Sequence, residues 1–266
     1  MKPKFKSLTY LLTYLRDRLK LIELIRFNNR ILRHVSRFFH KLQFMVEWRV
    51  GNPEYFEHQM DLNWKWHSSR SAYPMERGVF SSFALENDSP SKGATLDLCC
   101  GDGFYSYYFY SKRSAKVVAI DFDKQAINFA IKNYSGAENI DFLFGDIRRD
   151  IPEGPFENIV WDAAIEHFTE SEIQSLIGRI KAVLKSNGIL SGYTIVEPKH
   201  GGKHLHQHEY EFHSKEDLAR FLTPYFKNVQ VFSTTYPDRT NLYFYATDSL
   251  LPFERVNSIV VRWPDS

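Results

Sequence analysis

The chain has 266 residues, of which 43% are hydrophobic and 25% charged, and its formal net charge at pH 7 is +2. This composition fits one soluble globular domain of ordinary size with an appendage. Its two cysteines, Cys99 and Cys100, are adjacent, which excludes a disulfide framework and disfavours zinc and redox sites of C-x-x-C spacing, and free thiols favour a cytoplasmic protein.

The first segment, residues 1–50, is strongly basic. It holds twelve Lys or Arg and three Asp or Glu, a net charge of +9, so the remaining residues sum to −7. Apolar residues recur at helical spacing from about Leu8 to Val46, which predicts amphipathic helices with a break near Asn28 and Asn29. Such a basic extension can lie on an anionic membrane, contact nucleic acid, or pack on another protein surface.

No membrane span or secretory signal is expected in this segment. Its longest apolar run lies within LTYLLTYL, which is far too short to cross a bilayer and lacks a cleavage site of small residues. Gly51-Asn52-Pro53 ends the helical pattern, and residues 51–92 form a connecting segment that closes with a polar loop.

Residues 93–248 alternate between strand and helix patterns. Strands are predicted at residues 95–99, 116–121, 141–146, 158–163, 189–195, 229–235 and 242–248, and helices at 105–112, 124–134, 170–185 and 214–226. This alternation predicts an α/β fold with a doubly wound, mostly parallel sheet. Only a short loop separates the last two strands, so they must form an antiparallel hairpin. Residues 249–266 form a C-terminal tail.

The stretch LDLCCGDGF, residues 96–104, is the first candidate site. A strand reaches a small-residue turn and a helix follows, an arrangement that lets a cofactor approach the backbone at a helix N-terminus. Gly101, Gly103 and Ser106, with Asp121 downstream, also fit a nicotinamide-binding fingerprint. Asp97 before the turn, Gly145-Asp146 after the third strand and the terminal hairpin argue against that alternative.

This order of motifs resembles the class I S-adenosylmethionine-dependent methyltransferases, whose seven-stranded sheet ends in an antiparallel strand. The resemblance covers about residues 93 to 248. It implies S-adenosylmethionine as cofactor, with Cys99 in place of the first glycine of the family's loop. It also implies a lid before the fold, where Trp64, Trp66, His67 and Arg70 stand. The cofactor-binding set that we expect comprises Asp97, Cys99, Gly101, Gly103, Asp121, Phe122, Asp146, Ile147 and Asp162.

Catalytic candidates follow the fourth and fifth strands. Glu166 and His167 come directly after the fourth strand, where groups that move a proton to or from a hydroxyl, amine or acid belong. In the family such a pair also serves simply to shape the pocket floor. His208 joins them as the third candidate because the H-x-x-E-F pattern resembles methyltransferases of glycans and small metabolites, in which this histidine lies near the acceptor. The run from Arg239 to Tyr245 also resembles that group.

A metal site is a further candidate at the same residues. His204, His206 and His208 alternate along a histidine-rich loop and could converge on a cation. The pattern is also similar to small-RNA 2′-O-methyltransferases, which would make Glu166, His167 and His208 ligands of a divalent ion. Ala163 stands where that family places another glutamate, so a metal is not expected.

Three functional hypotheses follow. The favoured one is methyl transfer to a small-molecule or glycan-like acceptor in the cytoplasm, with residues 1–50 contacting a membrane or a protein. The second is metal-assisted 2′-O-methylation of an RNA 3′ end, in which the basic extension binds phosphates. The third is a non-catalytic partner protein that binds S-adenosylmethionine.

Overall fold

The computed structural model describes residues 12, 22–50, 71–85, 93–196, 208–237 and 239–252. The chain divides into two compact units, residues 1–52 and residues 53–266.

The first unit contains the long helix α2, Ile22–Val50. The predicted break is wrong, because α2 runs without interruption through Asn28 and Asn29. Asparagine lowers helix stability by only about 0.7 kcal/mol relative to alanine, so two asparagines do not interrupt a helix of 29 residues. Among the helices that the structure describes, none has the length and hydropathy needed to cross a bilayer.

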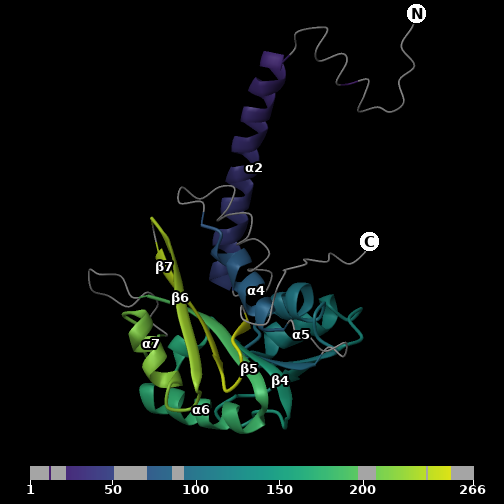
Figure 1. Ribbon diagram of the computed structural model, residues 1–266. Coiled ribbons are helices and arrows are strands. Elements are labelled where there is room, and N and C mark those ends of the chain that lie inside the picture. The colour runs from purple at the N-terminus through teal and green to yellow at the C-terminus, as the bar shows by residue number, and fades with distance from the viewer. Residues whose placement is uncertain are drawn as a thin grey trace, which may run out of the picture. The chain divides into compact units, whose positions relative to one another are not determined.

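The second unit is built on a seven-stranded sheet of order β3-β2-β1-β4-β5-β7-β6, which confirms the predicted fold (Figure 1). Strands β1 to β5 are parallel, and β7 is antiparallel to both β5 and β6. The strands are β1 Ala94–Leu98, β2 Lys116–Asp121, β3 Ile140–Phe144, β4 Phe156–Asp162, β5 Leu184–Ile195, β6 Asn228–Tyr236 and β7 Arg239–Thr247.

Helices cover both faces of this sheet. One face packs against α6, Glu170–Val183, and α7, Lys215–Leu222, through the largest apolar cluster, which includes Leu96, Leu98 and Trp161. The other face carries a second cluster with Val117, Ala119 and Ile127. On that side lie α4, Tyr73–Ala84, the π-helical turn η2, Ser106–Tyr110, and α5, Lys124–Asn133. Because side chains alternate along each strand, one strand serves both layers.

The strand order reverses between β1 and β4, so the loops that leave their carboxyl ends diverge and open a crevice. The loop after β1 and the short 3-10 helix η3, Ile165–His167, after β4 both lie at this edge. Since β7 runs in the opposite direction, its first residues lie at the same edge, beside the end of β5. The fold thus brings three distant segments of the sequence to one place.

Candidate functional site

The loop after β1 holds its shape through left-handed backbone conformations. Cys99, Gly101 and Gly103 have φ angles of 58°, 57° and 78°. Cys99 therefore adopts the conformation that a glycine would take without strain, which makes the turn despite the missing glycine. A Cβ atom on Gly103 would lie 2.6 Å from the Phe142 ring and 2.9 Å from the Ala130 methyl, so only glycine fits there.

Asp121 closes β2 and faces this loop. Its carboxylate accepts hydrogen bonds from the backbone N–H groups of Gly101 and Asp123, each at 2.8 Å. Burial raises the pKa of Asp121, while these backbone donors oppose the rise. The carboxylate retains lone pairs for a further donor, because each oxygen accepts more than one hydrogen bond.

Asp97 lies deeper, beneath the loop, and is buried. The hydroxyl of Ser106 donates to its Oδ2 at 2.5 Å. Burial raises the pKa of Asp97 to about 8, which the Ser106 hydrogen bond and Arg77 oppose.

A cavity of about 400 Å³ opens above the loop. Its lining residues are Cys99, Gly101, Asp121, Phe122, Gly145, Asp146, Ile147, Arg148, Ala163, Ala164, His167 and Phe168. The ring of Phe122 is 68% exposed, whereas Ile147 is buried. Six of the nine predicted cofactor residues thus line one cavity. Asp97, Gly103 and Asp162 are not among the lining residues.

Asp162, at the end of β4, forms a buried ion pair that the sequence analysis missed. Arg77 of α4 donates through Nε to Asp162 Oδ2 at 3.0 Å, and its Nη2 lies 2.8 Å from the same oxygen. The guanidinium also lies over the rings of Tyr105 and Tyr193. Burial raises the pKa of Asp162, and Arg77 opposes that rise. No signal in the sequence linked Arg77 to a strand end 85 residues later.

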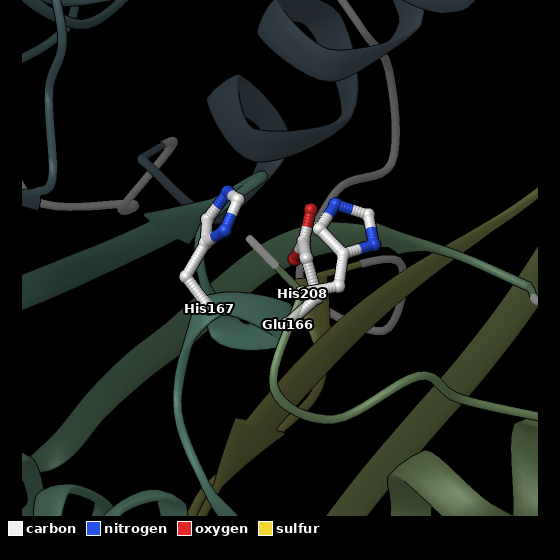
Figure 2. A group of neighbouring side chains, drawn as sticks. All are labelled: Glu166, His167 and His208. Atoms are coloured by element: carbon white, nitrogen blue, oxygen red, sulfur yellow. The ribbon is translucent and has the colours of Figure 1, made fainter. Parts of the chain in front are cut away.

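The side chains of Glu166, His167 and His208 lie close together beyond the carboxyl end of β4 (Figure 2). In that view the Glu166 carboxylate lies between the two imidazoles. One ligand atom from each residue lies within 4.8 Å of the others, and the two imidazole centroids are 5.1 Å apart. The predicted grouping of these three residues is therefore present in the structure, although it draws on segments 41 positions apart in the chain.

Backbone and side-chain hydrogen bonds fix this group. The Thr194 hydroxyl donates to Glu166 Oε2 at 3.0 Å, and the backbone carbonyl of Glu166 accepts from the N–H groups of Glu209 and Tyr210. His208 Nδ1 lies 3.1 Å from Glu211 Oε1. Burial lowers the pKa of His208, Glu166 opposes this shift and His167 adds to it. A lowered pKa keeps the His208 imidazole neutral near pH 7, the form that accepts a proton or binds a metal.

Several predicted residues lie outside the described part of the chain. These are His204 and His206 of the histidine-rich loop, and Trp64, Trp66, His67 and Arg70 of the expected lid. Ala163, which replaces the glutamate of the RNA methyltransferases, lines the cavity with a φ of 51°. Among the described residues the group of possible metal ligands is limited to Glu166, His167 and His208.

Residues 95–188 match a family model described as a methyltransferase domain. The chain contains a class I S-adenosylmethionine-dependent methyltransferase domain. The family recognised in the sequence is thereby confirmed.

Curated relatives of this methyltransferase domain match over part of their length. An uncharacterized methyltransferase of Synechocystis sp. is 33% identical over 113 residues, 42% of this chain and 52% of the relative. A malonyl-[acyl-carrier protein] O-methyltransferase of Halalkalibacterium halodurans is 30% identical over 36% of this chain and 37% of its own. The chain thus spans about half or less of the length of these relatives.

Solved structures share the fold of the methyltransferase domain. The N-methyltransferase NodS of Bradyrhizobium japonicum superposes with a TM-score of 0.55 at 15% identity, covering 67% of this chain and 97% of that protein. A 1,6-didemethyltoxoflavin-N1-methyltransferase of Burkholderia thailandensis superposes with a TM-score of 0.54 at 18% identity, covering 73% and 87%. At these identities the likeness concerns the fold alone.

Proposed function

We propose that this protein transfers a methyl group from S-adenosylmethionine to a hydroxyl, amine or acid of a small-molecule or glycan-like acceptor. The observation that carries the proposal is the continuity between the cavity over the β1 loop and the group of Glu166, His167 and His208. His167 belongs to both, since it lines the cavity and lies 5.1 Å from His208 between ring centroids.

The residues around the cavity fit the proposed cofactor. The left-handed loop gives close backbone approach, Asp121 can accept the two ribose hydroxyls, and the exposed ring of Phe122 can cover the adenine. Asp146 and Ile147 would contact the adenine amino group and its face. When bound, S-adenosylmethionine would supply an electrophilic methyl group on a sulfonium.

The protein's own contribution is alignment and proton removal. Methyl transfer from a sulfonium is an in-line displacement in which positive charge disappears. The protein can therefore accelerate it most by orienting the acceptor atom and removing its proton. His208 is neutral near pH 7 and is oriented by Glu211, which makes it a competent proton acceptor. His167 and Glu166, the latter held by Thr194, would orient the acceptor atom beside it.

A metal-assisted reaction at the same three residues is the second candidate. It is favoured by the separation of the ligand atoms, all within 4.8 Å. The deciding experiment is a calorimetric titration of Mn²⁺ into the full chain saturated with S-adenosylhomocysteine, repeated on His208→Ala. One site that disappears in the variant would favour a metal centre and a terminal ribose hydroxyl of RNA. No binding would leave the residues in acid–base roles.

A separate calorimetric titration of S-adenosylhomocysteine into the full chain tests the proposal as a whole. S-adenosylhomocysteine should bind the parent chain in a one-to-one ratio. Absence of binding would refute methyl transfer. Binding without transfer to any acceptor in a screen of sugars, amines, carboxylic acids and RNA ends would favour the third hypothesis, a non-catalytic partner.

We propose further that helix α2 attaches the enzyme to the cytoplasmic face of an anionic membrane. Seven of its exposed apolar residues recur at helical spacing along one face, and Leu32 and Phe39 lie beside them; the seven are Leu24, Phe27, Ile31, Val35, Phe38, Leu42 and Met45. Five cations, Arg26, Arg30, Arg33, Arg37 and Lys41, follow a second row that is displaced by roughly 120° around the helix. Apolar insertion combined with attraction to anionic headgroups is the mode of binding of interfacial helices.

Vesicle sedimentation tests this attachment. The full chain should bind phosphatidylcholine vesicles that contain phosphatidylserine and bind pure phosphatidylcholine more weakly. Phe38→Glu should release it, whereas Asn29→Glu, which introduces the same charge on the other side of α2, should retain most binding. Equal binding by both variants would contradict the proposal, and salt-dependent binding to RNA instead would favour the nucleic-acid hypothesis.

A further inference from the structure

Arg239 is the first residue of β7 and lies at the functional edge of the sheet. Because β7 is antiparallel to β5, Asn241 pairs with Ile195 and Tyr243 pairs with Tyr193, near the carboxyl end of β5. Tyr193 connects this region to the cavity, since its backbone carbonyl accepts the N–H of Ala163 at 2.9 Å and Ala163 lines the cavity wall.

The guanidinium of Arg239 contacts three neutral side chains of the described residues. Its Cζ lies 3.6 Å from the centroid of the Tyr73 ring. Nε donates to Asn241 Oδ1 at 2.9 Å, and Nη2 donates to the Tyr193 hydroxyl at 2.7 Å. Within the described part of the chain, no carboxylate lies within ion-pair distance of Arg239.

Two other charged residues near Arg239, Arg77 and Glu76, already have partners of their own. Arg77 pairs with Asp162, so its charge is compensated. Glu76 accepts hydrogen bonds from the hydroxyls of Thr234, Tyr236 and Tyr243 and forms no ion pair with Arg239. The Glu76 carboxylate balances the charge of the cluster as a whole, but its oxygens bind these hydroxyls, so among the described residues Arg239 has no carboxylate in direct contact.

A partly buried cation without a counterion in direct contact is costly, because burial removes hydration that nothing replaces. The side chains around Arg239 also hold the guanidinium plane in one orientation, against the Tyr73 ring. A preorganised fork of N–H donors matches the two oxygens of a carboxylate. A phosphate dianion would call for a second free cation, and Arg77 is already paired with Asp162.

From this geometry we infer that Arg239, stacked on Tyr73, binds a carboxylate of the acceptor. The inference rests on the proposed function and narrows it. A carboxylate held by a guanidinium has its negative charge neutralised and is a poor nucleophile, so it acts as an anchor. The methyl group then goes to a hydroxyl or amine elsewhere on the same acceptor, near Glu166, His167 and His208.

The test is a calorimetric titration of the full chain saturated with S-adenosylhomocysteine. Glucuronate and benzoate are compared with their neutral counterparts glucose and benzamide, and inorganic phosphate is a separate probe. Each carboxylate should bind at millimolar concentrations, and its neutral counterpart at least about tenfold more weakly, as expected for one charge-assisted contact. Phosphate should bind more weakly than either carboxylate.

Substitutions test whether Arg239 causes the preference for carboxylates. Arg239→Gln should lose the preference for carboxylates, and Arg239→Lys should keep the charge but bind more weakly because it lacks the fork. Lys116→Gln removes a positive charge from the opposite edge of the sheet, at the start of β2, and should match the parent. Unchanged affinity for S-adenosylhomocysteine and an unchanged melting temperature would show that the Arg239 variants are folded.

The outcomes that overturn the inference are distinct from failure of the proposed function. The inference fails if neither carboxylate binds, if charged and neutral probes bind equally, if Arg239→Gln keeps the preference, or if phosphate binds more tightly. In each of these cases S-adenosylhomocysteine would still bind. If S-adenosylhomocysteine itself does not bind the parent chain, the proposed function fails first.

Discussion

Arg77 of α4 lies 2.8 Å from the carboxylate of Asp162, and both side chains are buried. The pair joins the helix before the sheet to the end of β4, directly behind the cavity wall formed by Ala163 and Ala164. Asp162 Oδ1 has no hydrogen-bond partner among the residues that the structure describes. The ionised carboxylate therefore depends on Arg77 for its compensation.

Removing this arginine should be strongly destabilising. Arg77→Ala leaves the Asp162 carboxylate buried without its counterion, a change that typically costs about 3–5 kcal/mol of unfolding free energy. The loss should grow as the pH rises, because a buried acid with a raised pKa favours the unfolded state once it must ionise. Urea unfolding at two pH values checks this. Arg149→Ala, at a side chain that is 79% exposed, is the control. A loss below about 1 kcal/mol would contradict the account.

Asp97 should make the cofactor-free protein less stable as the pH rises. Its pKa is about 8 in the folded state, above the value of about 3.9 in an unfolded chain. Between these two values the unfolded state ionises first, so the unfolding free energy falls from about pH 4 to about pH 8 and then levels off. Asp97→Asn, which resembles the protonated form, should flatten this decline in urea unfolding. An equally steep decline in the variant would refute the assignment.

The loop after β1 offers two opposite substitutions. Gly103→Ala should destabilise the protein and weaken cofactor binding, because the added methyl meets Phe142 at 2.6 Å and φ is 78°. Cys99→Gly should be tolerated or mildly stabilising. The substitution removes about 1 kcal/mol of backbone strain at the left-handed residue, which offsets the larger conformational entropy that glycine loses on folding. Thermal unfolding of both variants tests this pair. Equal effects of the two substitutions would show that backbone conformation does not govern the loop.

Asp121→Ala should weaken the binding of S-adenosylhomocysteine by at least about tenfold. The variant loses the acceptor of the proposed ribose hydrogen bonds and the two backbone contacts that shape the loop, and each charge-assisted bond contributes about 1.5–3 kcal/mol. Calorimetry on the variant measures the loss. Asp141→Ala, an exposed acid that pairs with Lys116, should bind like the parent. If Asp121→Ala also binds like the parent, the cofactor site has been misplaced.

His167→Ala should slow methyl transfer while leaving cofactor affinity nearly unchanged. A group that moves the acceptor's proton typically increases the rate about 10²- to 10⁴-fold. Initial rates with an acceptor identified by screening would measure this, and His213→Ala, at an exposed histidine just before α7, is the control. A parallel loss of affinity for S-adenosylhomocysteine would mean that His167 shapes the cofactor pocket.

Periodicity and local motifs were sufficient for the fold. The strand runs, the glycine turn at Gly101 and Gly103, and the short loop before β7 are local features, and each is encoded within about ten residues. Their order along the chain predicted the mostly parallel sheet and its terminal hairpin, both of which the structure confirms. The break predicted at Asn28 and Asn29 is wrong because the low helix propensity of two residues is too weak to end a helix of 29 residues.

The sequence by itself determined the sheet, the cofactor loop and the candidates Asp121, Glu166, His167 and His208, because each stands at a strand end or within a motif. Only the tertiary structure decided that Arg77 neutralises Asp162 and that Arg239 keeps its charge against Tyr73 and Tyr193. These relationships join residues that are 46, 85 and 166 positions apart, through the antiparallel return of β7 and the packing of α4. Pairing of this kind depends on which elements become neighbours, and no local pattern of residues encodes it.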